Sequence, residues 1–215
     1  PAGRAFHSAW LVGLKLCLVG GQGETGRGFG LALDETWCYH LVPNTWVRLS
    51  PSAQTPAVSH LALVALHSSG TALAFGGQDR AALPTAALFE FSPLNSRWKR
   101  VTLSGPSPSR RAGHVSFLNS HTSEMYIALG QSVLPGSRSL MNDLWVFDCS
   151  TSMWQCIKGE HAGCLNSLLT DSTTIPEPIA FAASATLGGL NLGVTFGGFS
   201  LLERTTDPSL PGSLP

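Results

Sequence analysis

The sequence is poor in charged residues: Asp, Glu, Lys and Arg make up 12% of its 215 positions, about half their share in an average globular domain. The 13 basic residues are balanced by 13 acidic ones. Without an excess of positive charge, we expect neither nucleic acid nor anionic lipid as a partner. No apolar run reaches the roughly 18 residues that a membrane-spanning helix needs, so we expect no membrane insertion.

Several signatures of enzymes and of secreted proteins are also missing. The sequence contains no Gly-x-Ser-x-Gly motif, no phosphate-binding loop of the Walker type and no Asn-x-Ser/Thr glycosylation site. Its five cysteines are an odd number and are not densely spaced. These features predict a non-enzymatic protein without a cofactor, located in the cytoplasm.

What the sequence does contain is an internal repeat. Apolar segments that end in glycine recur as LKLCLVGG, TALAFGG, MYIALG and LGVTFGG. The first three are followed by an aromatic residue and, nine positions later, by a tryptophan: Trp37 with Trp46, Phe89 with Trp98, and Trp145 with Trp154. A further marker precedes the glycines as RAFHS, VSHLA and RAGHV, with histidines at His7, His60 and His114. A period near 50 residues is typical of a propeller blade of four antiparallel strands.

This order of markers resembles the kelch repeat and covers residues 4–200. The resemblance implies an all-β fold, a kelch-type β-propeller of four-stranded antiparallel blades. In each blade the first strand would carry the histidine, the second would end at the glycines, and the third and fourth would carry the aromatic residue and the tryptophan. There are departures: Phe89 replaces a tryptophan, Leu129 replaces a glycine, and Pro178 and Phe181 stand where the arginine and histidine would fall.

The chain contains fewer blades than a closed ring. We predict complete blades over 4–50, 51–104 and 105–158, an insertion over 159–175, a partial blade over 176–200 and a C-terminal loop over 201–215. Propellers usually close with four to eight blades. We therefore expect an incomplete ring in this chain, a fragment whose remaining blades belong to a longer protein.

Two motifs resemble ligand sites, but each fits the repeat better. The glycines of GQGETG (residues 21–26) are followed by another glycine-rich stretch, whereas a dinucleotide-binding loop needs a helix there, so we predict a loop between strands. A second group comprises Cys149, Cys156, His161 and Cys164. It lacks the short cysteine pairing of structural zinc sites, and we predict neither zinc nor a disulfide from it. The three repeated histidines are expected to hydrogen-bond within their blades rather than to bind a metal.

The resemblance also implies where a ligand would bind: two sets of loops on one face of the propeller would contact it. The set that follows the glycines comprises Gln22, Gln78, Asp79, Arg80, Gln131, Ser132, Phe199 and Ser200. The set that leads into the first strands comprises Arg4, Val58, Arg110 and Arg111. A glutamine follows the glycine in every complete blade, and three amides could pair with a peptide backbone. The arginines could bind an acidic group.

The resemblance favours a scaffold or adaptor that binds a partner protein or peptide, with a substrate receptor of a ubiquitin ligase as one such role. One alternative is a propeller enzyme, either copper oxidase-like or a small-molecule isomerase, with its site in missing blades. Copper oxidases of this shape need tyrosine ligands, and the only tyrosines are Tyr39 and Tyr126, both in predicted strands. The other alternative is an extracellular adhesion module, which cysteine pairing would favour and the missing glycosylation sites argue against.

Overall fold

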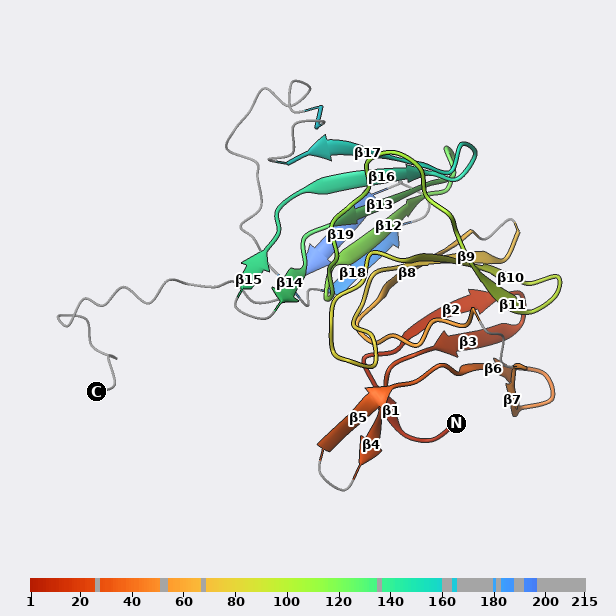
Figure 1. The fold of residues 1–215 in the computed structure, drawn as a ribbon. Helices are drawn as coiled ribbons and strands as arrows, with labels where there is room; N and C mark the ends of the chain where they lie inside the picture. The colour runs from red at the N-terminus through yellow and green to blue at the C-terminus, as the bar shows by residue number, and fades with distance from the viewer. Residues whose placement is uncertain are drawn as a thin grey trace, which may run out of the picture.

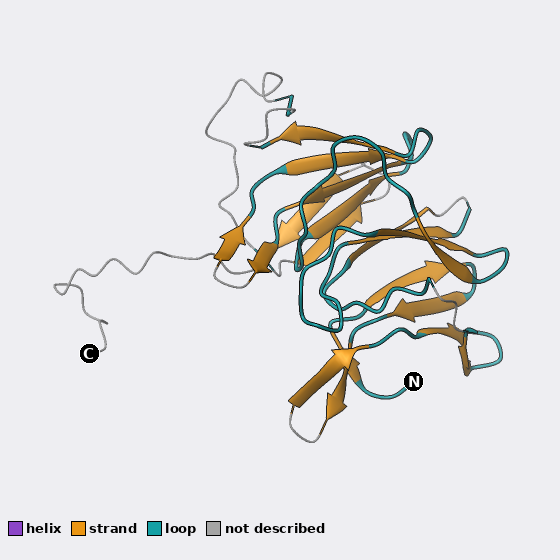
Figure 2. Ribbon diagram, viewed as in Figure 1, coloured by secondary structure: helices purple, strands orange, loops and turns teal. Residues whose placement is uncertain are grey.

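The structure is all-β, as the repeat predicts. A computed structural model describes residues 1–25, 28–50, 54–66, 69–134, 137–159, 164–165, 180, 183–187 and 192–196. Every regular element within these ranges is a strand (Figures 1 and 2). The same ranges hold no helix long and apolar enough to cross a membrane.

Three four-stranded antiparallel sheets form successive blades (Figure 1). The first blade consists of β2 (Ser8–Val12), β3 (Lys15–Val19), β6 (Thr36–His40) and β7 (Thr45–Arg48). The second consists of β8 (Ala62–Leu66), β9 (Thr71–Phe75), β10 (Leu88–Ser92) and β11 (Arg97–Arg100). The third consists of β12 (Val115–Asn119), β13 (Glu124–Ala128), β16 (Leu144–Asp148) and β17 (Met153–Lys158). The predicted third-strand aromatics and fourth-strand tryptophans lie in the strands expected for them.

The blades follow one another in an open arc. A further hairpin, β18 (Ala183–Leu187) and β19 (Leu192–Phe196), places β18 beside β12. The first strands of neighbouring blades, β2, β8, β12 and β18, also contact one another in chain order. In the part of the chain that the structure describes, these sheets do not close into a ring (Figure 1).

Two blades carry an extra hairpin after their second strand. In the first blade, β4 (Gln22–Thr25) pairs with β5 (Gly28–Ala32) and with the short β1 (Arg4–Ala5). In the third blade, β14 (Gln131–Leu134) pairs with β15 (Ser137–Leu140). The strand β5 after the glycine-rich stretch confirms that this stretch does not open a helix, although residues 26–27 lie outside the described ranges.

The core lies between blades, because the fourth-strand tryptophans of the second and third blades pack against the preceding blade. The Trp98 ring lies edge-on to Trp10 of the first blade, with centroids 5.6 Å apart, and its Nε1–H donates to Thr36 Oγ1 at 2.9 Å. The Trp154 ring packs in the same way against Phe75 of the second blade, at 5.2 Å. Since aromatic rings bury large apolar areas, these contacts hold neighbouring blades together.

The first blade has no blade before it in this structure, and its tryptophan is correspondingly uncovered. Trp46 is 39% exposed, whereas Trp98 and Trp154 at the same position in the second and third blades are 4% and 3% exposed. The three residues are equivalent because each lies opposite the aromatic residue two positions after the third-strand marker in the sheet register: Tyr39, Phe91 and Phe147. The outer face of the first blade is therefore an apolar sheet face exposed to solvent.

The prediction that the three histidines share one position is wrong. In each blade, the last glycine before the loop packs on the Cβ of one residue, and these residues are His7, Leu61 and His114. His60 lies one position earlier, because it is two positions after Val58, whereas His7 and His114 are each three positions after their arginine. All three histidines also precede the first strands rather than lying in them.

Four of the five cysteines are paired. Cys17 and Cys38 lie opposite each other on β3 and β6, with Cα atoms 4.0 Å apart, and form a disulfide. Cys156 forms a second disulfide with Cys164, which corrects the prediction of no disulfide in that cysteine group. Cys149 is unpaired. No three His, Cys, Asp or Glu side chains among the described residues are placed to hold a metal ion, and His161 lies outside them.

Candidate binding face

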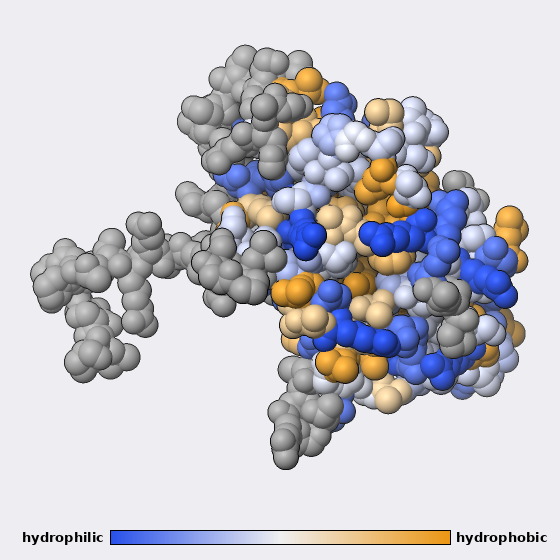
Figure 3. All heavy atoms as spheres, in the orientation of Figure 1, coloured by the Kyte–Doolittle hydropathy of each residue, from blue (hydrophilic) through white to orange (hydrophobic). Residues whose placement is uncertain are grey.

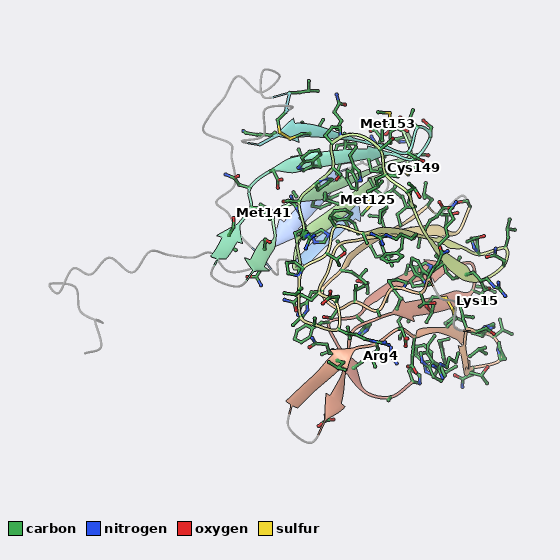
Figure 4. All side chains as sticks on the ribbon, viewed as in Figure 1. Arg4, Lys15, Met125, Met141, Cys149 and Met153 are labelled. Carbon is green, nitrogen blue, oxygen red and sulfur yellow. A yellow bond between two sulfur atoms is a disulfide. The ribbon has the colours of Figure 1, made fainter. Side chains whose placement is uncertain are left out.

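The two predicted loop sets lie together on one face, because in the first and second blades the loop after the second strand bonds to the segment leading into the next blade. Gly21 N donates to Val58 O at 3.0 Å, and Gly77 N donates to Arg111 O at 2.8 Å. We call this face the loop face. Figure 4 shows Arg4 on it and Lys15 at the opposite end of the first blade. On the side of the molecule visible in Figure 3, apolar residues are scattered among polar ones.

Glycine is required where these loops begin. Gly21 and Gly77 have φ angles of 88° and 91°, a region that residues with a Cβ rarely adopt. A Cβ added to them would lie 2.7 Å from Ala5 O and 2.6 Å from Ser59 O. The repeated glycines therefore let the loop of one strand pass close to the backbone that precedes the first strand.

The three glutamines that follow the glycines occupy equivalent positions. Gln22, Gln78 and Gln131 pair through their backbones with Ala5, Ser59 and Ala112, respectively. The side chains of Gln22 and Gln78 are half-buried, whereas that of Gln131 is mostly buried. Within the described residues, no hydrogen bond reaches the three side-chain amides. Each amide thus keeps its donors and its acceptor available to a ligand.

Arg111 is used inside the protein. Its side chain is fully buried and donates to both carboxylate oxygens of Asp143, at 2.6 and 2.7 Å, and to Leu129 O at 3.1 Å. Asp143 also accepts the Nε1–H of Trp145 at 2.8 Å. This guanidinium therefore fastens the lead-in of the third blade to its third strand, and no part of it is exposed to a ligand.

Arg4 has the same role in the first blade. It donates to Glu35 at 2.8 Å and to Gly20 O at 3.1 Å, and its side chain is 3% exposed. Trp37 donates to the same carboxylate at 3.0 Å. The Trp37 hydrogen bond, together with Arg4 and Arg48, holds the pKa of Glu35 below its usual value against the opposing effect of burial. An ionised Glu35 is thus favoured in the folded chain.

The arginine pairs follow a pattern that is visible in the sequence. The first and third blades each combine an arginine with an acidic residue two positions before a tryptophan, whereas the second blade has Val58, Ala87 and Phe89 at these positions. All three positions change together. An ion pair and its tryptophan are therefore replaced as a unit by apolar residues, which our sequence analysis did not recognise.

Asp79 and Arg80 also make local contacts. Asp79 Oδ1 accepts hydrogen bonds from Ala81 N at 2.8 Å and Leu83 N at 3.0 Å, so it shapes its own turn. Arg80 reaches the first blade, where it pairs with Asp34 at 2.7 Å. Both side chains of this pair are about half exposed (55% and 50%). Since exposed ion pairs contribute little stability, a ligand can displace Asp34 from Arg80 at small cost.

The remaining candidates are more accessible or lie outside the described residues. Arg110 is exposed and Ser132 is half-buried. Phe199 and Ser200 fall outside the described ranges. The accessible part of the loop face thus consists of Gln22, Gln78, Arg80, Arg110 and Ser132, with Gln131 behind them.

The histidines near this face have lowered pKa values, so they do not supply positive charge to it. His114 is buried edge-on against Phe75, with ring centroids 5.6 Å apart. Burial, and secondarily the charge of Arg111, lower the pKa of His114 to about 3. Burial also lowers the pKa of His7 and of His60. These rings therefore remain neutral near pH 7.

Sequence reasoning missed the pairing of Phe6 with His60, whose rings stack on the loop face with centroids 4.0 Å apart and planes 24° apart. In the register set by the loop glycines, both correspond to Gly113 of the third blade. The backbones form a chain across the blades: His60 N donates to Phe6 O at 3.0 Å, and Gly113 N donates to His60 O at 3.1 Å. The one available signal was that ring residues replace the glycine of RAGHV in the other two repeats.

Comparison with known proteins agrees with this architecture. Residues 1–205 match the family model described as the Attractin/LZTR1 beta-propeller. Over 168 residues the chain is 31% identical to the serine/threonine-protein phosphatase BSL2 of Arabidopsis thaliana, a match that covers 71% of this chain and 16% of that protein. The chain thus spans a small part of that relative's length. With the blades, the repeated markers and the family match in agreement, the chain belongs to the Attractin/LZTR1 family of kelch-type β-propellers.

Proposed function

We propose that this propeller is an interaction scaffold or adaptor that binds a partner protein or peptide on its loop face. The observation that carries the proposal is the set of Gln22, Gln78 and Gln131, at equivalent positions of three consecutive blades, with side-chain amides that no described residue binds. A peptide backbone presents alternating donors and acceptors, and a glutamine amide can satisfy both. The exposed Arg80 and Arg110 would add contacts to acidic groups. Arg4 and Arg111 act in this proposal only by holding the loops in place.

A role as a cytoplasmic substrate receptor of a ubiquitin ligase is one form of this proposal. The family supports protein partners in general, while the ligase role would need a recruiting domain beyond these 215 residues. The two disulfides favour an oxidising compartment instead, as an extracellular adhesion module would have. The cysteine labelling described in the Discussion distinguishes these two settings.

The experiment that tests the proposal is affinity purification of the intact protein followed by mass spectrometry. Wild type is compared with the triple variant Gln22→Ala, Gln78→Ala, Gln131→Ala. The control is Arg97→Ala, an exposed side chain beside the turn at the opposite end of the second blade. We expect a stoichiometric partner that the triple variant loses and the control retains, with unchanged circular dichroism. Equal recovery by the triple variant would contradict binding through these amides.

We also propose that further blades, from a longer chain, complete the ring by packing on the first blade. The support is a comparison of equivalent positions in the sheet register. On the outer face of the first blade Leu11, Leu16 and Trp46 are 54%, 37% and 39% exposed. At the same positions of the third blade, Leu118, Met125 and Trp154 are 7%, 0% and 3% exposed, because the second blade covers them. A kelch-type blade is the occupant that this face would fit in the same way.

A further inference from the structure

A cavity lies between the first and second blades, towards the end of the molecule opposite the loop face, where Figure 4 shows Lys15. Its volume is about 360 Å³, which is within the range of sites that hold small molecules. The first blade contributes strand residues to its wall, and the second contributes residues of its two hairpin turns together with Phe91. The cavity is separate from the loop face, so the proposed function does not account for it.

The sheet register places two basic side chains next to each other in this cavity. Lys15 lies opposite both Val12 and His40 on the neighbouring strands, and residues directly opposite each other share a face of the sheet. The paired Cys17 and Cys38 lie two positions further along the same strands, on the same face. Both cysteines belong to the core between the first two blades. Lys15 and His40 therefore project from the face of the first blade that is turned towards the second.

The protein itself does not use these two basic groups. Lys15 and His40 make no side-chain hydrogen bond or ion pair with any residue that the structure describes. Among the described residues that line the cavity there is no Asp or Glu. Ser69 also lines it, and Ser69 Oγ accepts from Thr71 N at 3.2 Å, which leaves its O–H able to donate. The cavity thus combines donors and positive charge without a compensating carboxylate.

The other two blades have different residues at the positions of this basic pair. Counted from the last glycine before the loop and from the third-strand aromatic, the equivalent residues are Thr71 and Ser92 in the second blade and Glu124 and Asp148 in the third. Glu124 accepts from Thr122 Oγ1 at 2.6 Å and from Tyr126 Oη at 2.9 Å. Asp148 accepts from Ser150 N at 2.7 Å. The acidic pair is therefore used within its own blade, whereas the basic pair is left for a ligand.

We propose that this cavity binds a small organic anion, with its anionic group at Lys15 and His40. Lysine supplies a compact positive charge with three donors, and the imidazole ring and the serine hydroxyls add further donors. Between two blades this charge is screened less than on an open surface. The wall next to these groups is apolar, formed by Val12, Leu49 and Phe91, and it fits an apolar part of the same molecule. A phosphate ester and a carboxylate both have this chemistry.

The test is calorimetric titration of the intact protein with phenyl phosphate, benzoate and benzyl alcohol, three probes that share a ring and differ in charge. We expect the anions to bind at least about tenfold more tightly than the neutral alcohol. Lys15→Ala should weaken anion binding by a similar factor. The double variant Lys15→Glu, His40→Asp, which copies the third blade, should abolish it. The control Lys99→Ala removes the same charge from an exposed lysine that pairs with Glu90 at 3.1 Å, and it should bind as wild type does.

The possible outcomes separate a specific site from a general charge effect. Tighter binding of phenyl phosphate than of benzoate would support a phosphate ester as the ligand, and the reverse would support a carboxylate. Equal weakening by Lys15→Ala and Lys99→Ala would overturn the proposal, because net charge alone would then explain the binding. Benzyl alcohol binding as tightly as the anions would overturn it too, as would the absence of binding by all three probes at millimolar concentration. Circular dichroism checks that each variant is folded.

Discussion

The guanidinium of Arg111 and the carboxylate of Asp143 form a buried, two-pronged ion pair, with N–O distances of 2.6 and 2.7 Å. A buried pair of this kind costs much desolvation, and its removal on one side leaves an uncompensated charge. The second blade omits the pair and has Val58 and Ala87 at these positions. The lead-in segment and the third strand are thus joined by a charged pair in the third blade and by apolar residues in the second.

Arg111→Ala should destabilise the protein by about 3–5 kcal/mol, because the carboxylate of Asp143 would remain buried without its cationic partner. The neighbouring Arg110→Ala should change the free energy of unfolding by no more than about 0.5 kcal/mol, because that side chain is exposed. Urea unfolding followed by circular dichroism measures both. The double variant Arg111→Val, Asp143→Ala copies the second blade and should recover most of the loss. A double variant as unstable as Arg111→Ala would show that the apolar version cannot serve in the third blade.

Trp98→Ala should cost about 3–5 kcal/mol, since it removes a buried ring from the interface between the first two blades. Trp46→Ala should cost about 1 kcal/mol or less in this chain, because its ring has no blade to pack against. Chemical denaturation of the two variants side by side makes the comparison. In a longer protein that supplies the preceding blade, we expect Trp46→Ala to become as costly as Trp98→Ala. A persistently small cost there would count against the proposed covering blade.

Stability should fall as the pH drops from about 6.5 towards 3, partly because of His114. Its pKa is near 6.5 in the unfolded chain and about 3 in the folded one, so the unfolded state binds more protons in this window. The slope from one such group is at most about 1.4 kcal/mol per pH unit. His114→Leu, which introduces the residue found at this position in the second blade, should flatten the profile. Arg111 and Asp143 face the site in both proteins, so the difference between the two profiles isolates the histidine.

Alkylation of the denatured, unreduced protein should modify one cysteine per chain, and five after reduction. Cys149 is the free thiol, and in the folded protein it should react slowly even at pH 8, because burial and the nearby Asp148 raise its pKa to about 11. Intact-mass measurement counts the labels. Five labels without reductant, in protein taken directly from cells, would mean that the disulfides do not form there and would support the cytoplasmic setting.

Much of the fold could be predicted because each blade repeats the same markers. The nine-residue step from Trp145 to Trp154 reflects two antiparallel strands joined by a short turn, and the paired glycines mark the close approach to the next lead-in. These features are local, so the sequence records them directly. The disulfide between Cys17 and Cys38 is different, since it depends on the register of β3 against β6, which no spacing of 21 residues reveals.

The candidate site was harder to predict, because a residue type does not say which way its side chain turns. Arg111 was expected to face a ligand. Only the burial of its partner Asp143 shows that the Arg111 side chain faces the core. The stacking of Phe6 on His60 was missed because His60 was aligned with His7, one position away from its true counterpart Phe6. A shift of one residue is enough to exchange a buried position for an exposed one.

The bonds from Gly21 to Val58 and from Gly77 to Arg111 both run from one blade to the next. The shape of each of these two loops is therefore set by the repeat that follows it as well as by the lead-in of its own blade. A single blade exchanged between two relatives would bring its own loop residues but would be shaped by a foreign neighbour. It would also reshape the loop of the repeat before it. Recombination that preserves specificity should therefore cut inside a blade, after the third strand begins, so that each glycine pair stays with its own lead-in, and should keep the lead-in of the following blade unchanged.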